Sequence, residues 1–111
     1  MSQATKKWQA AALIDVLPGP DSGKERYLEP FESGDVSLGI YAPRGIDQQE
    51  PHDKDEFYFV ISGRGQFVHG DERSPFAPGD ALFVPAGEAH RFEDFSDDFS
   101  AWVVFFGAAP S

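Results

Sequence analysis

Short apolar runs separated by Gly, Pro or Asp recur about every 8–12 residues from Tyr27 onward, and this spacing most constrains the fold. It is typical of strands joined by tight turns, and no helical segment lies between the runs. We predict seven strands, at residues 31–32, 36–42, 57–61, 65–69, 81–84, 90–94 and 101–106. Strands without intervening helices favour an all-β antiparallel sandwich or barrel over a parallel sheet.

The N-terminal part of the chain has a different pattern. Residues 8–17 carry the alanines and the apolar spacing of a short helix, which the following Pro18-Gly19-Pro20 cannot continue. With 111 residues, the chain is long enough for one domain and too short for two. We therefore expect an N-terminal arm or helix (residues 1–26), one β-barrel domain (27–107) and a C-terminal tail (108–111).

The composition limits the partners and the chemistry. Eleven phenylalanines against one methionine predict a bulky aromatic core. A net charge of −10 makes nucleic acid and anionic membranes poor partners. Because the chain has no cysteine, disulfides and thiolate chemistry are excluded. The apolar runs are far shorter than the roughly 20 residues of a membrane helix, and the start has no apolar signal core, so we expect a cytoplasmic protein.

The three histidines are the candidate metal ligands. If His52 lies in a strand, Glu50 points to the same side, two residues away. His52 can then meet Glu56 and His90 if the barrel closes. Two imidazoles and one carboxylate form the set that suits non-haem Fe(II) and also accepts Mn, Ni, Co or Zn. The remaining histidine, His69, is expected at a surface hairpin tip.

The segment around His90 carries a spaced motif. It reads Gly79, five residues, Pro85, one residue, Gly87, two residues, His90, three residues and Asp94. This pattern resembles the second motif of the cupins, which are small double-stranded β-helix (jelly-roll) barrels. The family has Asn where this chain has Asp94, and that side chain is expected to hydrogen-bond backbone near His90.

The segment around His52 resembles the first cupin motif, with two departures. His52, Glu56 and Gly63 have the family's spacing. Glu50 occupies the place of the first histidine of the family's His-x-His pair, and Gly45 is one residue nearer than usual. The resemblance covers roughly residues 31–106 and implies a jelly-roll barrel with a divalent metal (Fe, Mn, Zn or Ni) on His52, Glu56 and His90.

The resemblance implies a metal-dependent enzyme without choosing the reaction. Dioxygenases (oxidoreductases), decarboxylases, isomerases and lyases share this layout, with a small oxygenated substrate such as an enol, keto acid or sugar acid chelated to the ion. Glu50 is expected as a fourth ligand or a pocket carboxylate. Glu50 or Tyr58, which is in phase with Glu56 along a strand, would move a proton.

Two other functions stay open at this point. The chain can be a non-catalytic ligand-binding or sensing module, which the missing first histidine favours. It can also be a metal-free isomerase in which His90 is the base and Glu56 orients it. In each case we expect a homodimer, because the aromatic strands 57–60 and 102–106 leave apolar surface on so small a barrel.

Overall fold

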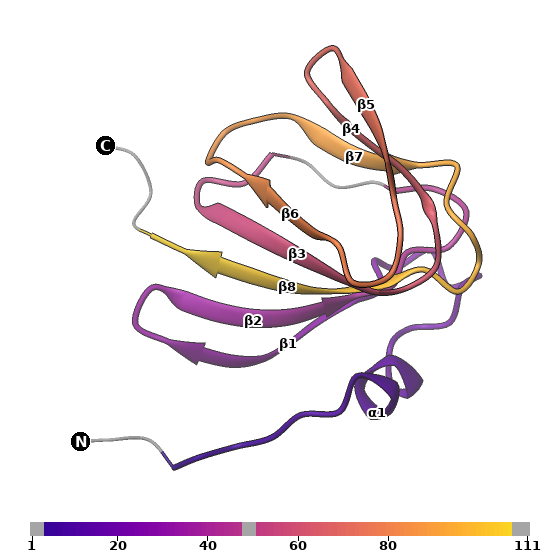
Figure 1. The fold of residues 1–111 in the computed structure, drawn as a ribbon. Helices are drawn as coiled ribbons and strands as arrows, with labels where there is room; N and C mark the ends of the chain where they lie inside the picture. Colours follow the sequence, from indigo (N-terminus) through magenta and orange to yellow (C-terminus); the bar gives the residue numbers. More distant parts are fainter. Residues whose placement is uncertain (1–3, 48–50, 108–111) are drawn as a thin grey trace.

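The predicted strands form two antiparallel sheets in the computed structural model, which describes residues 4–47 and 51–107 (Figure 1). Five strands pair in the order β1-β2-β8-β3-β6, and three pair in the order β5-β4-β7. Within the described residues the elements are α1 (Ala10–Asp15), β1 (Tyr27–Ser33), β2 (Val36–Tyr41), β3 (Asp55–Ser62), β4 (Gly65–His69), β5 (Glu72–Phe76), β6 (Ala81–Val84), β7 (His90–Glu93) and β8 (Ser100–Phe106). The all-β fold is therefore confirmed.

The core lies between the two sheets, and strand β3 shows how the sequence builds it. Alternate side chains of a strand point to opposite faces. Glu56, Tyr58 and Val60 are accordingly buried in the interior, whereas Phe59 is 41% exposed on the outer face. The main core cluster is aromatic, as the composition predicts, and comprises Tyr41, Tyr58, Val60, Phe67, Phe76, Val84, Phe92, Phe99, Ala101 and Val103.

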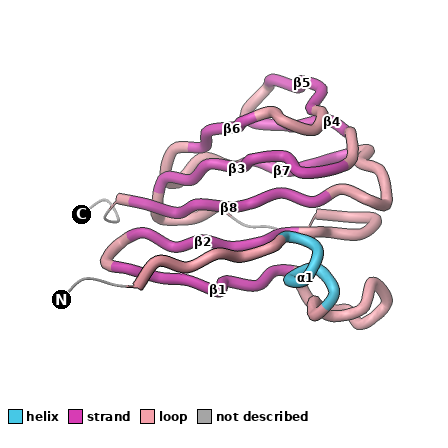
Figure 2. The backbone as a smooth tube through the Cα atoms, turned by 60° about the horizontal axis from the view of Figure 1, so that its bottom comes forward, coloured by secondary structure: helices cyan, strands magenta, loops and turns pink. Residues whose placement is uncertain are grey.

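The N-terminal helix packs on the outer face of the five-stranded sheet of its own barrel. Its residues Leu13 and Ile14, with Leu17 just beyond, contact Ile40 and Trp102 of the sheet. Figure 2 shows α1 beside β1 and β2, at one end of the sheet. The helix is shorter than the expected segment 8–17 and spans six residues. No helix in residues 4–47 and 51–107 is long and apolar enough to cross a membrane.

Two strands differ from the prediction for physical reasons. Strand β5 was not expected, because four of its five residues are polar or proline and only Phe76 is buried. Its structure comes from pairing with β4, from Gly65 opposite Phe76 to His69 opposite Glu72. Strand β1 is longer than the expected 31–32, since Pro30 and a register shift interrupt its alternation.

Candidate metal centre

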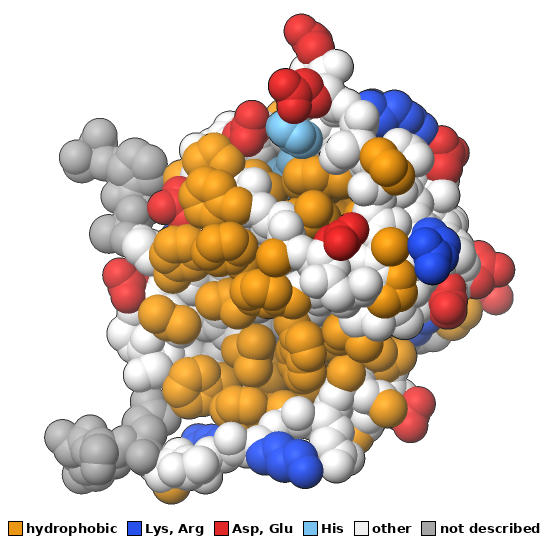
Figure 3. Space-filling view, in the orientation of Figure 1, with side chains coloured by type: hydrophobic (Ala, Val, Ile, Leu, Met, Phe, Trp, Pro, Cys, Tyr) orange, Lys and Arg blue, Asp and Glu red, His pale blue; other side chains and the backbone are white. Residues whose placement is uncertain are grey.

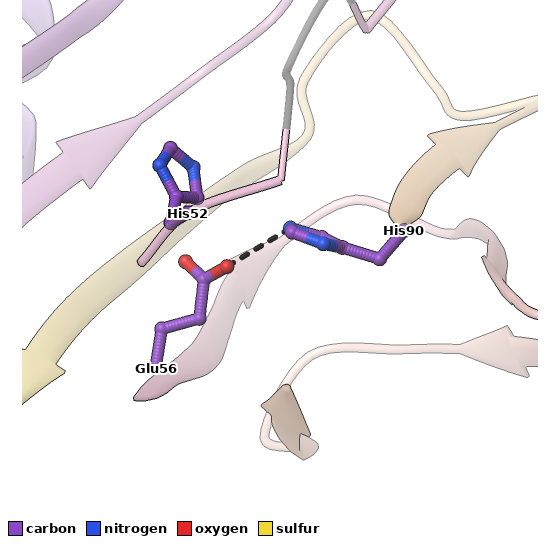
Figure 4. Close-up of side chains that lie close together, drawn as sticks. All are labelled: His52, Glu56 and His90. Atoms are coloured by element: carbon purple, nitrogen blue, oxygen red, sulfur yellow. Dashed lines mark ion pairs between the residues drawn. The ribbon is translucent and has the colours of Figure 1, made fainter. Parts of the chain in front are cut away.

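Three side chains from separate elements converge inside the barrel (Figure 4). His52 comes from the loop before β3, Glu56 from β3 and His90 from the first position of β7. Each offers one ligand atom, and these atoms lie within 4.8 Å of one another. The carboxylate Oε1 of Glu56 is 2.9 Å from His90 Nε2, and these side chains are 1% and 0% exposed.

Backbone pairing explains the convergence. Glu56 faces the interior by strand alternation, and it lies opposite Val84 of β6 and Phe105 of β8. Phe105 also packs edge-on against the His52 ring, with centroids 4.8 Å apart. The Gly87 amide donates to the His52 carbonyl over 2.7 Å, so the loop of the second motif holds the histidine of the first.

Hydrogen bonds orient the His90 ring. Its Nδ1 lies 3.0 Å from the Glu88 carbonyl, which can only accept, so Nδ1–H donates there. Nε2 therefore faces the interior, where the Tyr58 hydroxyl lies 3.0 Å away. Tyr58 thus projects into the interior, in phase with Glu56 as expected.

The charges around His90 favour its protonated form before any metal binds. Burial lowers its pKa, but hydrogen bonds to Glu56 and to the Glu88 carbonyl outweigh that effect, together with the negative charges of Glu56 and Asp47. The net result is a pKa raised above the ordinary value. When His90 is protonated, it forms a buried ion pair with Glu56.

Two ligand atoms of the cluster are buried without a hydrogen-bond partner in the described part of the chain, namely His52 Nε2 and Glu56 Oε2. Buried polar atoms in native structures almost always have a partner. A cation between the three side chains would satisfy both atoms, with small side-chain movements bringing them to bonding distance. Two imidazoles and a carboxylate suit Fe(II), Mn, Ni or Zn, so the residues fit a divalent transition metal.

Glu50, expected as a ligand or proton carrier, lies outside the described residues. The reasoning that placed it beside His52 assumed a strand, but His52 and the preceding Pro51 lie in a loop. Strand alternation therefore does not place Glu50 in the centre, and its role stays a prediction.

One polar residue next to the centre, Asp47, escaped the sequence analysis, and another, His69, is less exposed than expected. Asp47 is buried, accepts from the Tyr41 hydroxyl over 2.5 Å and accepts from the Phe92 amide over 2.8 Å. His69 lies opposite His90 in the β4–β7 pair, so both point to the inner face. His69 lies at the tip of the β4–β5 hairpin, as expected, but its side chain is 31% exposed and thus half-buried. The sequence did contain a signal for this orientation, because His69 follows Phe67 by two residues and therefore shares its face of the strand.

The Asp94 side chain makes a different contact from the one expected at the Asn position of the motif. Its side chain pairs with Arg73 at 2.5 Å on the surface, and its φ is 51°. Asn and Asp adopt this left-handed conformation more readily than most residues. Backbone conformation thus explains why Asp can replace Asn at the end of β7.

A surface pocket borders the centre at His90. Its volume is about 350 Å³, and Asp47 and Arg91 also line it. Small-molecule sites combine an apolar wall with a few polar groups of this kind. The pocket therefore places one cation and one carboxylate beside His90.

The chain matches the cupin domain family over residues 37–106, which is more than half of its length. The chain belongs to the cupin family. Protein SCO3923 of Streptomyces coelicolor is a relative that is 42% identical over 81 residues, covering 71% of this chain and 77% of the relative.

Solved structures show the same fold. A double-stranded β-helix protein from Klebsiella pneumoniae has a TM-score of 0.76 at 16% identity, covering 96% of this cupin and 95% of that chain. A Cupin 2 conserved barrel protein from Salinispora arenicola has a TM-score of 0.68 at 20% identity, with 97% and 92% coverage. DMSP lyase DddQ from Ruegeria pomeroyi has a TM-score of 0.69 at 23% identity, covering 88% of this cupin and 55% of the lyase. At these identities the likeness concerns the fold alone.

Proposed function

We propose that this cupin is a metal-dependent enzyme that acts on a small oxygenated molecule, with His52, Glu56 and His90 holding a divalent ion. The observation that carries the proposal is the buried cluster in which His52 Nε2 and Glu56 Oε2 have no partner in the described chain. Each buried polar atom without a partner costs about 1–3 kcal/mol. An ion between them would remove both costs, whereas a purely structural role leaves them in place.

The roles of the chain's own residues follow from the contacts. The Glu88 carbonyl fixes the His90 ring so that Nε2 points inward. Tyr58, fully buried with its hydroxyl 3.0 Å from that nitrogen, is placed to hold or deliver a proton. An ion held by His52, Glu56 and His90 would supply Lewis-acid or O₂ chemistry to a chelating substrate. Glu50 is proposed as a fourth ligand or as the second proton carrier.

One of the fold relatives is an enzyme by name, and at 23% identity it does not choose a reaction for this cupin. DddQ is a DMSP lyase, and lyase chemistry is one of the classes that the two motifs imply. An enol, a keto acid or a sugar acid has the paired oxygens that chelate a divalent ion. We propose a substrate of this type.

One observation favours acid–base catalysis without a metal. Glu56 Oε1 lies 2.9 Å from His90 Nε2, so these two side chains can exchange a proton with each other as an acid–base pair. Glu50, in the place of the first motif's first histidine, favours a further alternative, a binding or sensing module that holds a ligand or a metal without turnover. The metal content of the protein separates the metal-free mechanism from our proposal. Measurement of turnover separates the binding or sensing module from it.

The experiment is metal analysis of protein purified without a histidine tag, followed by titration of the stripped protein with Fe(II), Mn(II), Ni(II) and Zn(II). We expect about one ion per chain. His52→Ala or Glu56→Gln should weaken metal binding by at least about 100-fold, because losing a residue that merely supports a metal ligand already costs up to about 100-fold. His69→Ala is the matched control, since His69 lies beside His90 but outside the cluster. Equal affinity in all variants would refute the site.

Turnover is tested next on the loaded protein, by oxygen uptake and with a panel of keto acids and uronates. Product formation that His52→Ala abolishes would support the enzyme. Tight metal binding without turnover of any compound would favour the binding module, and turnover in the stripped protein would favour the metal-free mechanism.

A further inference from the structure

A second pocket, away from the metal centre, collects positive charge. It lies between residues 20–26, which precede β1, and residues 41–46 at the end of β2, and its volume is about 220 Å³. Lys24, Arg26 and Arg44 line it, and Glu25 is the only carboxylate among its lining residues. Three cations less one carboxylate give the lining a net charge of +2. None of the three candidate metal ligands lines this pocket.

This concentration of cations is unusual for the chain. The sequence has nine basic residues against 19 acidic ones, and its net charge is −10. On the face that Figure 3 shows, the Lys and Arg side chains are scattered around the edge of the molecule. Three of the nine basic residues nevertheless line one pocket. A positive pocket on an acidic protein attracts a small anion, whereas the net charge repels a large polyanion such as nucleic acid.

Backbone carbonyls hold the two arginines in fixed positions. Arg26 Nε donates to the Ala42 carbonyl over 2.8 Å, and Arg26 Nη1 donates to the Pro18 carbonyl. Arg44 Nη1 donates to the same Ala42 carbonyl over 3.2 Å and to the Phe99 carbonyl over 3.0 Å. Both side chains are half-buried. The two guanidinium groups therefore meet at one oxygen, and little conformational entropy is left for a ligand to remove.

These contacts leave several donors of the two arginines without a partner. A guanidinium group has five N–H donors. Within residues 4–47 and 51–107, Arg26 Nη2 and Arg44 Nε and Nη2 make no hydrogen bond, and neither arginine forms an ion pair. Arg73 and Arg91, in contrast, both pair with Glu93. A role in tying the two loops together explains the donors in use, and a bound anion would satisfy the others.

The two guanidinium groups also repel each other. Burial lowers the pKa of Arg44, and the charge of Arg26 lowers it further. The negative charges of Asp97 and Asp98 offset these effects only in part. An anion bound at both arginines would counter the repulsion, because an opposite charge favours the charged form of each group.

The size and the chemistry of the pocket indicate the class of ligand. Sites for drug-sized ligands are larger, at about 300–1,000 Å³. The fork of N–H donors on a guanidinium group matches the oxygens of a carboxylate or a phosphate. We propose that this pocket binds a small dianion, either a phosphate group or a dicarboxylate, through Arg26 and Arg44, with Lys24 adding charge. The proposal does not depend on the metal centre.

Isothermal titration calorimetry with inorganic phosphate, sulfate and malonate tests the proposal, at an ionic strength kept constant with potassium chloride. We expect one anion to bind per chain with a dissociation constant below about 1 mM. Tighter binding of phosphate and sulfate would identify a phosphate group as the ligand, and tighter binding of malonate a dicarboxylate. Either result supports the proposal, whereas no saturable binding of any of the three would overturn it.

Arginine variants assign the binding to this pocket and not to the metal centre. Arg26→Gln and Arg44→Gln should each weaken binding of the preferred anion about 10–100-fold, the usual worth of a hydrogen bond to a charged group. Arg64→Gln is the matched control, because it removes the same charge from an exposed position outside the pocket. Unchanged affinity in the two pocket variants, or an equal loss in all three, would overturn the proposal.

Two milder variants keep the test valid if loss of an arginine unfolds the loops. The side chains of Lys24 and Glu25 are exposed, so their removal should leave the thermal stability unchanged. Lys24→Gln should weaken anion binding about 2–5-fold and Glu25→Gln should tighten it by a similar factor, the worth of an exposed charge pair. Opposite shifts support the proposal. Equal affinity in both variants, or shifts in the same direction, would mean that the arginines only join the loops.

Discussion

The phenol ring of Tyr27 lies directly over Gly39, in the place that any other residue at position 39 would need for its Cβ. A Cβ built on Gly39 would lie 2.2 Å from the Tyr27 hydroxyl oxygen and 2.5 Å from two ring carbons. Tyr27 pairs with Tyr41, two residues from Gly39 on the same inner face of β2. Strand β1 can therefore place an aromatic ring in the interior because β2 has no side chain there.

Replacing this glycine should destabilise the fold through that one contact. Gly39→Ala is expected to lower the free energy of unfolding by about 1–3 kcal/mol, the usual range for an overpacked core. In a Tyr27→Ala background the same change should cost little or even stabilise, since alanine reduces the entropy of the unfolded chain. Urea denaturation of the four proteins measures the difference. An equal loss in both backgrounds would mean that Tyr27 is not responsible.

Tyr27 and Tyr41 form a matched pair for hydroxyl removal. The Tyr27 hydroxyl is buried without a hydrogen-bond partner in the described chain, whereas that of Tyr41 donates to buried Asp47 over 2.5 Å. Tyr27→Phe should leave the free energy of unfolding unchanged or raise it by up to about 1 kcal/mol. Tyr41→Phe should lower it by about 1–3 kcal/mol, because Asp47 loses a donor. Thermal denaturation compares the two, and a larger loss for Tyr27→Phe would contradict the structure.

The same tyrosines predict the response to alkali. Burial raises the pKa of Tyr41, and the charge and hydrogen bond of Asp47 raise it further. Burial also raises the pKa of Tyr27, together with the negative charges of Glu29, Glu56 and Glu25. The unfolded phenol ionises near pH ~10, while the folded one keeps its proton. The stability that these two protonated phenols contribute is thus fully present below about pH 10 and is lost as the pH rises further.

For Tyr41, which is 2% exposed, this loss amounts to about 1.4 kcal/mol per pH unit above about pH 10. Denaturant titrations from about pH 8 to about pH 11 measure it, and phenolate absorbance should show delayed ionisation of both tyrosines. Tyr41→Phe should flatten the slope. A wild-type profile that stays level through pH 11 would contradict the prediction.

Acid should compete with metal for the two histidines. Each imidazole must lose its proton to donate a lone pair, so affinity falls as pH drops through the histidine pKa values. The raised pKa of His90 means that this competition begins at a higher pH than for a free imidazole. We expect the affinity to fall by up to about two decades per pH unit once both histidines are protonated. A slope near one would implicate a single histidine, and a flat line would remove His52 and His90 from the site.

The roles proposed for Glu50 and Tyr58 can be separated by measuring metal affinity and turnover together. Glu50→Gln should weaken metal binding by at least about tenfold if Glu50 is a ligand. Tyr58→Phe should leave metal affinity within a few-fold but lower turnover by about 10²–10⁴-fold, the usual worth of a general acid or base. Unchanged metal affinity with altered turnover in Glu50→Gln would make Glu50 a pocket residue instead.

The sequence predicts those features that depend on local alternation of side chains. Features that depend on pairing between distant strands could not be predicted from it. Alternation along β3 is visible in the sequence and correctly places Glu56 and Tyr58 inside. Strand β5 is not visible, because its polar residues become a strand only through β4. Likewise, His69 faces the interior because the register of β4 with β7 sets it opposite His90, and register between distant strands cannot be derived from one sequence.

Helix α1 gives the barrel a second, smaller apolar cluster on the outside of its five-stranded sheet. Leu13 and Ile14 of the helix pack with Ile40 and Trp102, so these two sheet residues are held by a contact that does not involve the interior. A chain shortened by the helix would leave that part of the outer face in contact with water. Its free energy of unfolding would therefore fall, although the metal centre between the sheets would keep all of its residues.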